Sequence, residues 1–228
     1  MRIGAKIKTK GLILHLDASV PRSYKGNGTS WNDLTSHDTV GVNTNAVFQS
    51  NSFYYDGSGD YTRITRSDLN GGNWSYPIAS FEFWFKPIAP NSGTTANNIF
   101  TVEDSFEMSF GQVGSNGMNA IQWASNPWAW RGSSSAERIK TDEFSQIVYI
   151  HTATNHYLYI NGILVETTAS SGTLSSGNGT YPYITLMGRN TGTNSPAKGN
   201  LSIVRIYDHV LTDIEILNNY NNQKNRFL

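Results

Sequence analysis

Short alternating segments of β type, separated by clusters of Gly, Asn and Ser, run through most of this chain of 228 residues. In Phe81 to Lys86 the phenylalanines occupy every second position, and because side chains alternate between the two faces of a strand, they share one face. Glu82, Trp84 and Lys86 share the other face, so this strand is expected to be half buried. Helical patterns are scarce. The sequence therefore predicts an all-β fold in which two antiparallel sheets form a sandwich.

A hairpin is the strongest local signal in the chain. Asn161-Gly162 separates two apolar segments, and both residues tolerate the positive φ of a type I′ turn. The strands expected from alternation are Gly11 to Asp17, Phe53 to Tyr55, Tyr61 to Ile64, Phe81 to Lys86, Asn98 to Glu103, Phe106 to Phe110, Ala120 to Trp123, Ser145 to Thr152, His156 to Ile160, Ile163 to Thr168, Tyr183 to Met187 and Leu201 to Tyr207.

One short helix is expected near the C-terminus. Thr212 is a good N-cap residue and Glu215 lies three positions further on, a capping-box pattern that predicts a helix over Asp213 to Asn222. The residues that would share an apolar face of this helix are Ile214, Leu217 and Tyr220.

Composition and charge exclude several classes of protein. Apolar residues make up 38% of the chain and charged residues 15%, which is typical of a folded domain; residues 11–228 are expected to form one domain after an N-terminal extension of residues 1–10. Because 17 basic residues balance 17 acidic ones, a nucleic-acid partner is not expected. The chain has no cysteine for a disulfide or a thiolate metal site. Neither a secretion signal nor an apolar run of about 20 residues for a membrane span is expected.

Six short motifs follow one another along residues 11–221. They are Gly11-Leu-Ile-Leu-His-Leu-Asp17, Ser30-Trp-Asn-Asp-Leu34, Tyr55-Asp-Gly-Ser-Gly-Asp-Tyr61, Ser80-Phe-Glu-Phe-Trp-Phe85, Leu158-Tyr-Ile-Asn-Gly162, and Val204-Arg-Ile-Tyr-Asp208 with Leu211, Glu215 and Ile216. In this order they resemble the motifs of concanavalin A-like, laminin-G-like jelly rolls, which implies a two-sheet antiparallel jelly-roll sandwich. The first motif is similar to versions in virion proteins of tailed bacteriophages, which implies a place on a capsid, tail or fibre.

The segment Gln122 to Arg131 is the best candidate for a binding surface. Its three tryptophans offer flat apolar faces with a donor edge, suited to stacking on a pyranose or to anchoring a protein partner. Its proline argues against one regular central strand. The alternative is that two of the tryptophans pack inward, since tryptophan is highly buried on average. The residues assigned to this surface are Trp123, Asn126, Trp128, Trp130 and Arg131.

Two groups of acidic residues are candidates for an ion site or for a catalytic site. Asp56 and Asp60 lie on a glycine-rich turn and could supply two of the six to eight oxygens of a structural calcium ion, which the resemblance also implies; the alternative is hydrogen bonding within the turn. The nearest match to the paired carboxylates of a glycosidase is Glu103 to Glu107. Asp104 directly follows Glu103 and would point to the opposite face, so a polar turn between strands is expected there.

No catalytic motif is visible, so the expected function is that of a non-catalytic structural or adhesive component of a phage particle with a lectin-like fold: a capsid decoration, fibre or tail protein. Its expected location is the virion, and its partners are other virion proteins, a cell-surface glycan, or both. A component of this kind is expected to form a homo-oligomer. The alternatives are a soluble carbohydrate-binding lectin module and a glycoside hydrolase of the same superfamily.

Overall fold

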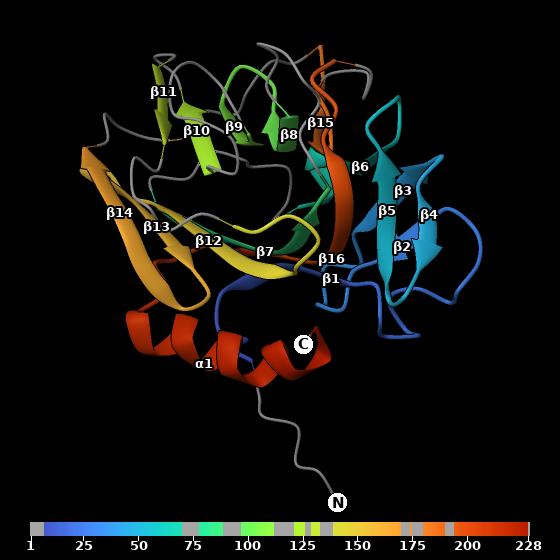
Figure 1. Cartoon of the computed structure of the whole chain (residues 1–228), viewed down its shortest axis with the longest axis horizontal. Helices are drawn as coiled ribbons and strands as arrows, with labels where there is room; N and C mark the ends of the chain where they lie inside the picture. Colours follow the sequence, from blue (N-terminus) through green and yellow to red (C-terminus); the bar gives the residue numbers. More distant parts are fainter. Residues whose placement is uncertain are drawn as a thin grey trace, which may run out of the picture.

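Two antiparallel β-sheets lie face to face, and one helix packs outside them (Figure 1). The sandwich expected from the alternating sequence pattern is therefore confirmed, together with the short helix near the C-terminus. The computed structural model describes residues 7–69, 78–88, 97–111, 121–125, 129–132, 139–169, 174, 180–189 and 194–227.

Sheet A contains the longest strands of the molecule. In spatial order they are β14 (Ile163–Ala169), β13 (Asn155–Ile160), β12 (Ser145–His151), β7 (Ala79–Pro87), β16 (Lys198–Tyr207), β5 (Ser52–Asp56) and β4 (Val47–Gln49). An eighth strand, β1 (Leu12–Asp17), pairs with the second half of β16, beyond the part that pairs with β5. The last strand of the chain therefore lies in the middle of sheet A, between β7 on one side and β5 and β1 on the other.

Sheet B is built from shorter strands. In spatial order they are β11 (Ala129–Gly132), β10 (Ile121–Ser125), β9 (Phe106–Phe110), β8 (Asn97–Val102), β15 (Tyr183–Leu186), β6 (Tyr61–Thr65), β3 (Val40–Thr44) and β2 (Ser30–Asn32). A single 3-10 turn at Arg66–Asp68 follows β6, and another at Lys224–Arg226 follows the C-terminal helix. The sequence did not predict β2, β3, β4 and β11, which have only three to five residues each and become regular by pairing with a neighbouring strand.

The core lies between the facing sides of the two sheets. Phe81, Phe83 and Phe85 of β7 point into it and are fully buried. The ring centroid of Phe81 lies 5.4 Å from that of Phe106, and the centroid of Phe85 lies 5.9 Å from that of Phe110. Ring pairs at these separations add roughly 0.5–1.5 kcal/mol beyond the burial of their area. The alternation seen in the sequence of β7 thus determines the centre of the core.

The outer face of sheet A is buried as well, which corrects the expectation that Phe81 to Lys86 is half buried. Glu82 and Trp84 point away from the core but are covered by α1 (Asp213–Gln223) and the residues that follow it. The Trp84 ring stacks on Tyr220 at 5.9 Å and on Phe227 at 4.5 Å between centroids. Alternation shows to which face a side chain points, but not whether a distant helix covers that face.

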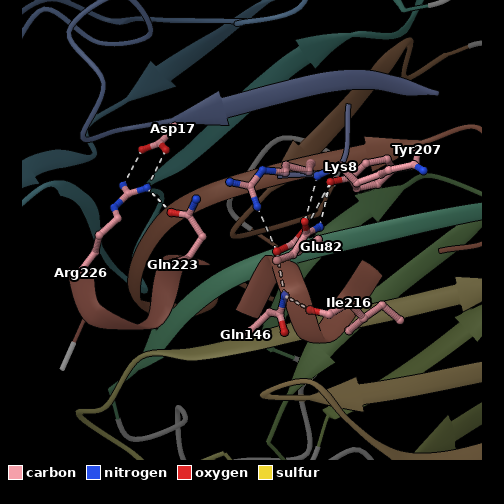
Figure 2. A network of polar contacts seen from close by, with 10 residues as sticks. Lys8, Asp17, Glu82, Gln146, Tyr207, Ile216, Gln223 and Arg226 are labelled. Atoms are coloured by element: carbon pink, nitrogen blue, oxygen red, sulfur yellow. Dashed lines mark hydrogen bonds and ion pairs between the residues drawn. The ribbon is translucent and has the colours of Figure 1, made fainter. Parts of the chain in front are cut away.

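A buried ion pair joins β7 and β16 beneath α1 (Figure 2). Arg205 Nη1 lies 3.0 Å from Glu82 Oε1, and both side chains are 0% exposed. The side-chain amides of Gln146 and Asn219 each donate to the Glu82 carboxylate at 2.9 Å. Because Asn219 belongs to α1, the helix supplies part of the hydrogen bonding that a buried charge requires.

The helix begins where the sequence predicts. Thr212 and Glu215 form the capping box, each side chain accepting from the backbone N–H of the other residue. The side of α1 that faces sheet A contains Ile216, which is fully buried. Ile214 and Leu217, two of the residues expected on its apolar face, are exposed to solvent instead. The helix therefore leaves apolar side chains on the surface of the molecule.

The hairpin between β13 and β14 is confirmed. Asn161 has a φ of 54° and Gly162 a φ of 83°, as a type I′ turn requires, and Ile160 pairs with Ile163 across the turn. A Cβ atom placed on Gly162 would lie 3.0 Å from the Leu217 Cδ1 atom, so the turn packs directly against α1.

Candidate functional site

The outer face of sheet B differs from that of sheet A in its cover. In the described part of the chain, no helix lies on this face, since α1 packs against the other sheet (Figure 1). Burial alternates along β3 and β6, with partly or fully exposed side chains at every second position. These side chains point away from the core and are the material from which a binding surface can be formed.

An arginine lies between two tyrosines on this face, on the strands β6 and β15. Tyr61 and Arg63 are two residues apart on β6 and point the same way, while Thr62 and Ile64 are turned into the core. The Arg63 Cζ atom lies 4.8 Å from the ring centroid of Tyr61 and 5.0 Å from that of Tyr183 on β15. Exposed contacts of this kind contribute about 0.5–1 kcal/mol each. We call Tyr61, Arg63 and Tyr183 the aromatic ladder.

The aromatic ladder has apolar and polar neighbours in the same row of the sheet. Val42 on β3 pairs with Arg63 and is 49% exposed. On the other side of Arg63, Thr185 of β15 pairs with it and also with Thr101 of β8. Thr185 and Thr101 are only 3% and 1% exposed, so the accessible groups of this row are the two tyrosine rings, the guanidinium and Val42. Such a surface can contact both the C–H face and the hydroxyl groups of a sugar.

Next to this row, one arginine binds two glutamates. Arg189 Nη2 lies 2.8 Å from Glu103 Oε1, and Arg189 Nε lies 3.0 Å from Glu107 Oε1. Asn98 donates to Glu107 at 2.9 Å and accepts a hydrogen bond from Ser109. Both glutamate side chains are nearly buried, whereas the arginine side chain is 36% exposed. The nearly buried glutamates thus hold the arginine in place, and the guanidinium of the Glu103–Arg189–Glu107 cluster lies at the surface.

Burial and charge act in opposite directions within this cluster. Burial raises the pKa of Glu107, and the hydrogen bond from Asn98 and the charge of Arg189 reduce that rise without cancelling it. The hydrogen bonds to Glu103 raise the pKa of Arg189, so the guanidinium stays charged. Glu107 therefore takes up a proton more readily than an exposed glutamate does.

The backbone around the two glutamates confirms the expected turn between strands. Asp104 lies in the turn from β8 to β9 with a φ of 59°, and its side chain is exposed. The sequence did not predict that Glu103 and Glu107 converge on Arg189, which lies 86 residues from Glu103 along the chain. Both carboxylates already accept from protein donors and are nearly buried. The two glutamates therefore hold Arg189 in place at the surface, and they are poorly placed to act as a pair of acids on a substrate.

The aromatic ladder was also missed by the sequence analysis. Tyr61 and Arg63 lie two positions apart on an expected strand, and this spacing was the one sequence signal for them. Tyr183 also lies on an expected strand, but only the pairing of β15 with β6 brings it next to Arg63.

The tryptophan segment expected to bind a ligand forms two strands. Trp123 lies on β10 and is fully buried in the hydrophobic core. Trp123 packs inward, which is the alternative that the sequence left open. Its ring is therefore not available to a ligand, and Trp123 is removed from the candidate surface. Trp130 and Arg131 belong to β11, the edge strand of sheet B that pairs with β10. Asn126 and Trp128 lie outside the described residues.

The turn at Asp56 and Asp60 forms hydrogen bonds of its own. Asp60 accepts from the backbone N–H of Asp56 at 2.9 Å, and Asp56 accepts from the N–H of Ser58 at 2.6 Å. Within the ranges that the structure describes, no three or more His, Cys, Asp or Glu side chains are grouped to hold a metal ion. Calcium takes six to eight oxygens. Two carboxylates already engaged in a turn fit that requirement poorly, and calcium binding stays a prediction.

A family model described as the concanavalin A-like lectin/glucanases superfamily matches residues 56–217, more than half of the chain. The chain belongs to this superfamily. The matched residues include both the aromatic ladder and the Glu103–Arg189–Glu107 cluster. No curated protein sequence matches the chain. Of the helices that the structure describes, none combines the length and the apolar character needed to cross a bilayer.

Solved structures of two kinds are similar to this superfamily member. The botulinum neurotoxin serotype D ligand-binding domain in complex with N-acetylneuraminic acid has 16% identity and a TM-score of 0.65, and the match covers 93% of this chain and 51% of that chain. The serotype G binding domain gives the same four values. A Trypanosoma rangeli sialidase has 14% identity and a TM-score of 0.60, over 98% of this chain and 35% of that chain. The chain thus spans about half the length of the toxin domains, and the likeness shows the fold alone.

Proposed function

We propose that this protein is a non-catalytic, carbohydrate-binding component of a phage particle, and that the outer face of sheet B holds the glycan. The aromatic ladder is the observation that carries the glycan part of the proposal. Two partly exposed tyrosine rings flank a guanidinium in one layer on a sheet. A pyranose has an apolar C–H face that stacks on such rings and hydroxyl groups that accept hydrogen bonds from a guanidinium.

Three further observations support glycan binding. The family to which the chain belongs is named for lectins and glucanases, and one domain of the same fold was solved with N-acetylneuraminic acid bound. In addition, Arg63 is held between two rings and Arg189 between two glutamates. Side chains that are already ordered lose little entropy when a ligand binds, which favours affinity.

We propose that the protein is not catalytic because the two glutamates on this face are already bound by other side chains. Retaining glycosidases place two carboxyl groups about 5 Å apart around the scissile bond, one of them protonated as the acid. Here Glu103 and Glu107 share Arg189, and Asn98 donates to the second of them. Wild-type protein is therefore expected to release no product from the glycans it binds. Hydrolysis that Glu103→Gln or Glu107→Gln abolishes would establish the hydrolase alternative instead.

The location on a phage particle is supported by the resemblance of the motif Gly11 to Asp17 to domains of virion proteins. The protein would serve there as a capsid decoration, fibre or tail protein that contacts a cell-surface glycan. Mass spectrometry of purified virions checks this part of the proposal, and recovery of the protein with the particle is expected. If it binds glycans but is never found with virions, the soluble lectin alternative replaces it.

A glycan array followed by calorimetry tests the binding surface. Arg63→Ala and Tyr183→Ala are each expected to weaken the best glycan by about tenfold or more, since a stacked ring or a guanidinium contact is worth roughly 1–2 kcal/mol. Tyr54→Ala is the matched control, because Tyr54 is a partly exposed tyrosine on sheet A. Equal losses in all three variants, or no glycan bound by the wild type, would contradict the proposal.

A further inference from the structure

We propose that a groove between β13 and the start of α1 binds a small organic cation, in which a protonated amine is attached to an apolar body. The groove lies on the outer face of sheet A, the face that α1 covers (Figure 1). Its volume of about 550 Å³ lies within the roughly 300–1,000 Å³ of sites for small ligands. The aromatic ladder lies on sheet B, so this second site goes beyond glycan binding and does not depend on it.

Apolar and aromatic side chains form most of the groove. Tyr157 and Tyr159 lie two positions apart on β13 and point to the same side of the sheet. Ile150 of β12 pairs with Tyr157 and is buried at the floor. Val210 and Ile214, which are 37% and 72% exposed, form the opposite wall. The Tyr159–Asp213 groove is lined by these five side chains and by Thr152, Leu211, Thr212 and Asp213.

Hydrogen bonds to β7 hold the wall that precedes α1. The Ser80 hydroxyl donates to the backbone carbonyl of His209 at 2.7 Å and accepts from the backbone N–H of Leu211 at 3.0 Å. The Leu211 side chain is buried in a small apolar cluster with Ile150 and Tyr159. The wall is therefore ordered before a ligand arrives, which lowers the entropy that binding costs.

Most polar side chains of the groove already have partners. Thr152 Oγ1 accepts from the backbone N–H of Asn155 at 2.9 Å and donates to the carbonyl of the same residue at 2.8 Å. The Thr212 hydroxyl accepts in the capping box. Tyr159 donates to Asp213 Oδ1 at 2.6 Å and, among the residues that the structure describes, is the one hydrogen-bond partner of that carboxylate. The second carboxylate oxygen of Asp213 is thus the charged acceptor open to a ligand.

The charge of the groove favours a cation. Of the described residues that line it, only Asp213 carries a charge. Residues 145–165, which supply β12 and β13, contain no Asp, Glu, Lys or Arg, and residues 208–214 contain no Lys or Arg. Burial raises the pKa of Tyr159 and the Asp213 carboxylate raises it further, so the phenol stays protonated and continues to donate. The faces of tyrosine rings also attract cations.

These features together select the chemical class of the ligand. An ammonium group donates to the open oxygen of Asp213, while its apolar body covers Tyr157, Val210 and Ile214. A sugar fits less well, because most of its hydroxyl groups would lose water without gaining a partner. A ligand that carries a carboxylate would be repelled by Asp213.

Three ligands with the same phenyl body test the role of charge. Phenethylammonium, phenethyl alcohol and hydrocinnamate differ mainly in the group at the end of the chain. In calorimetry at about pH 7, where the amine is protonated, the ammonium is expected to bind with a Kd of about 1 mM or tighter. The alcohol is expected to bind about fivefold or more weakly, and the carboxylate more weakly still. No binding of the ammonium, or equal binding of the alcohol, overturns the proposal.

Asp213→Asn removes the charge and keeps the size of the side chain. The variant is expected to weaken binding of phenethylammonium by about fivefold or more and to change binding of the alcohol by less than about twofold. Asp68→Asn is the matched control, because Asp68 is an exposed aspartate in the 3-10 turn after β6. Melting temperatures confirm that both variants are folded, and equal losses of affinity in the two contradict the proposal.

A change on the opposite wall tests the groove without altering Asp213. Val210 is partly exposed, so Val210→Lys is expected to fold normally and to abolish binding of phenethylammonium, because the new ammonium group competes for the carboxylate. In the wild type, the NMR methyl signals of Ile150, Val210 and Ile214 are expected to shift during the titration. Unchanged affinity in Val210→Lys, or shifts confined to other residues, would place the cation elsewhere and overturn the assignment.

Discussion

The outer faces of the two sheets each contain an arginine bound to glutamate, but the surroundings of the two pairs differ. Glu82 and Arg205 on sheet A are completely buried beneath α1, and side-chain amides from another strand and from the helix donate to Glu82 (Figure 2). Arg189 on sheet B is 36% exposed beside its glutamates. The same chemical pair therefore holds a helix in place on one sheet and presents a cation at the surface of the other.

This difference shows that the cover over a sheet determines the role of its outward side chains. Strand alternation places Glu82 and Glu107 in equivalent outward positions on their strands. On sheet A, α1 removes water and leaves the ion pair dependent on protein donors. On sheet B, the arginine at the end of the network remains open to a ligand.

The largest expected effect comes from breaking the covered pair. Glu82→Gln leaves Arg205 buried without its counter-charge, which is expected to lower the free energy of unfolding by about 3–5 kcal/mol. Glu103→Gln is the matched change on sheet B and is expected to cost about 1 kcal/mol or less, because Arg189 keeps water and Glu107 as partners. Urea unfolding curves measure both values. Equal losses in the two variants would show that the cover does not decide the role of the pair.

The next largest effect is expected on stability, from replacing one of two isoleucines of α1 with alanine. Ile216→Ala removes a fully buried side chain between the helix and sheet A and is expected to cost about 2–4 kcal/mol. Ile214→Ala changes a residue that is 72% exposed and is expected to alter stability by less than about 0.5 kcal/mol. Thermal unfolding gives the comparison. A large loss from Ile214→Ala would show that the exposed side of the helix has a contact within the monomer.

The two faces are also expected to respond oppositely to pH. Burial acts to raise the pKa of Asp17, but hydrogen bonds from Arg226 and its charge outweigh burial and hold the pKa below its ordinary value. This contribution to stability is present above pH 3.8, the ordinary value, and is lost as pH falls through the folded-state pKa. Burial raises the pKa of Glu107, so its contribution is fully present below pH 4.5 and is lost as pH rises through the raised pKa.

Variants separate the two contributions. The stability advantage of wild type over Asp17→Asn is expected to shrink as pH falls below 3.8, the ordinary pKa of the group. Glu107→Gln, which resembles the protonated acid, is expected to match wild type at low pH and to become more stable than wild type as pH rises above 4.5. Melting temperatures from about pH 2.5 to 7, the range over which carboxyl groups titrate, provide the measurement. Parallel profiles for the two variants would contradict the assigned signs.

Calcium gives the smallest expected effect. The prediction of a site at Asp56 and Asp60 rests on two carboxylates, so a weak site half filled at millimolar calcium would add about 0.4 kcal/mol and raise the melting temperature by about 1–2 °C. Asp56→Ala is expected to remove that rise, and a chelator to reverse it. An unchanged melting temperature would leave turn hydrogen bonding as the role of both carboxylates.

The sequence predicted those features of the fold that depend on neighbouring residues. The alternation in Phe81 to Lys86, the turn residues Asn161 and Gly162, and the capping box at Thr212 all specify local backbone, and the structure confirms each of them. Short strands such as β2 and β4 were missed, because their three residues have too little pattern of their own.

Features that join distant segments were not predictable. Burial of Trp84 depends on Tyr220 and Phe227, which α1 and the residues after it bring from the end of the chain. The aromatic ladder depends on pairing between β6 and β15, and the position of Arg189 on its reach across β8 and β9. In each case the residue types are visible in the sequence, but the neighbour that gives them a role is supplied by topology.

The position of β16 has a consequence for how the protein is made. This strand is among the last to leave the ribosome, yet β1, β5 and β7 all attach to it. At about 5–20 residues per second, these earlier strands wait on the order of ten seconds for their partner. Their apolar side chains are meanwhile open to misassociation and to chaperones. Nascent chains stalled before Lys198 are accordingly expected to aggregate, whereas completed chains close sheet A in a late step.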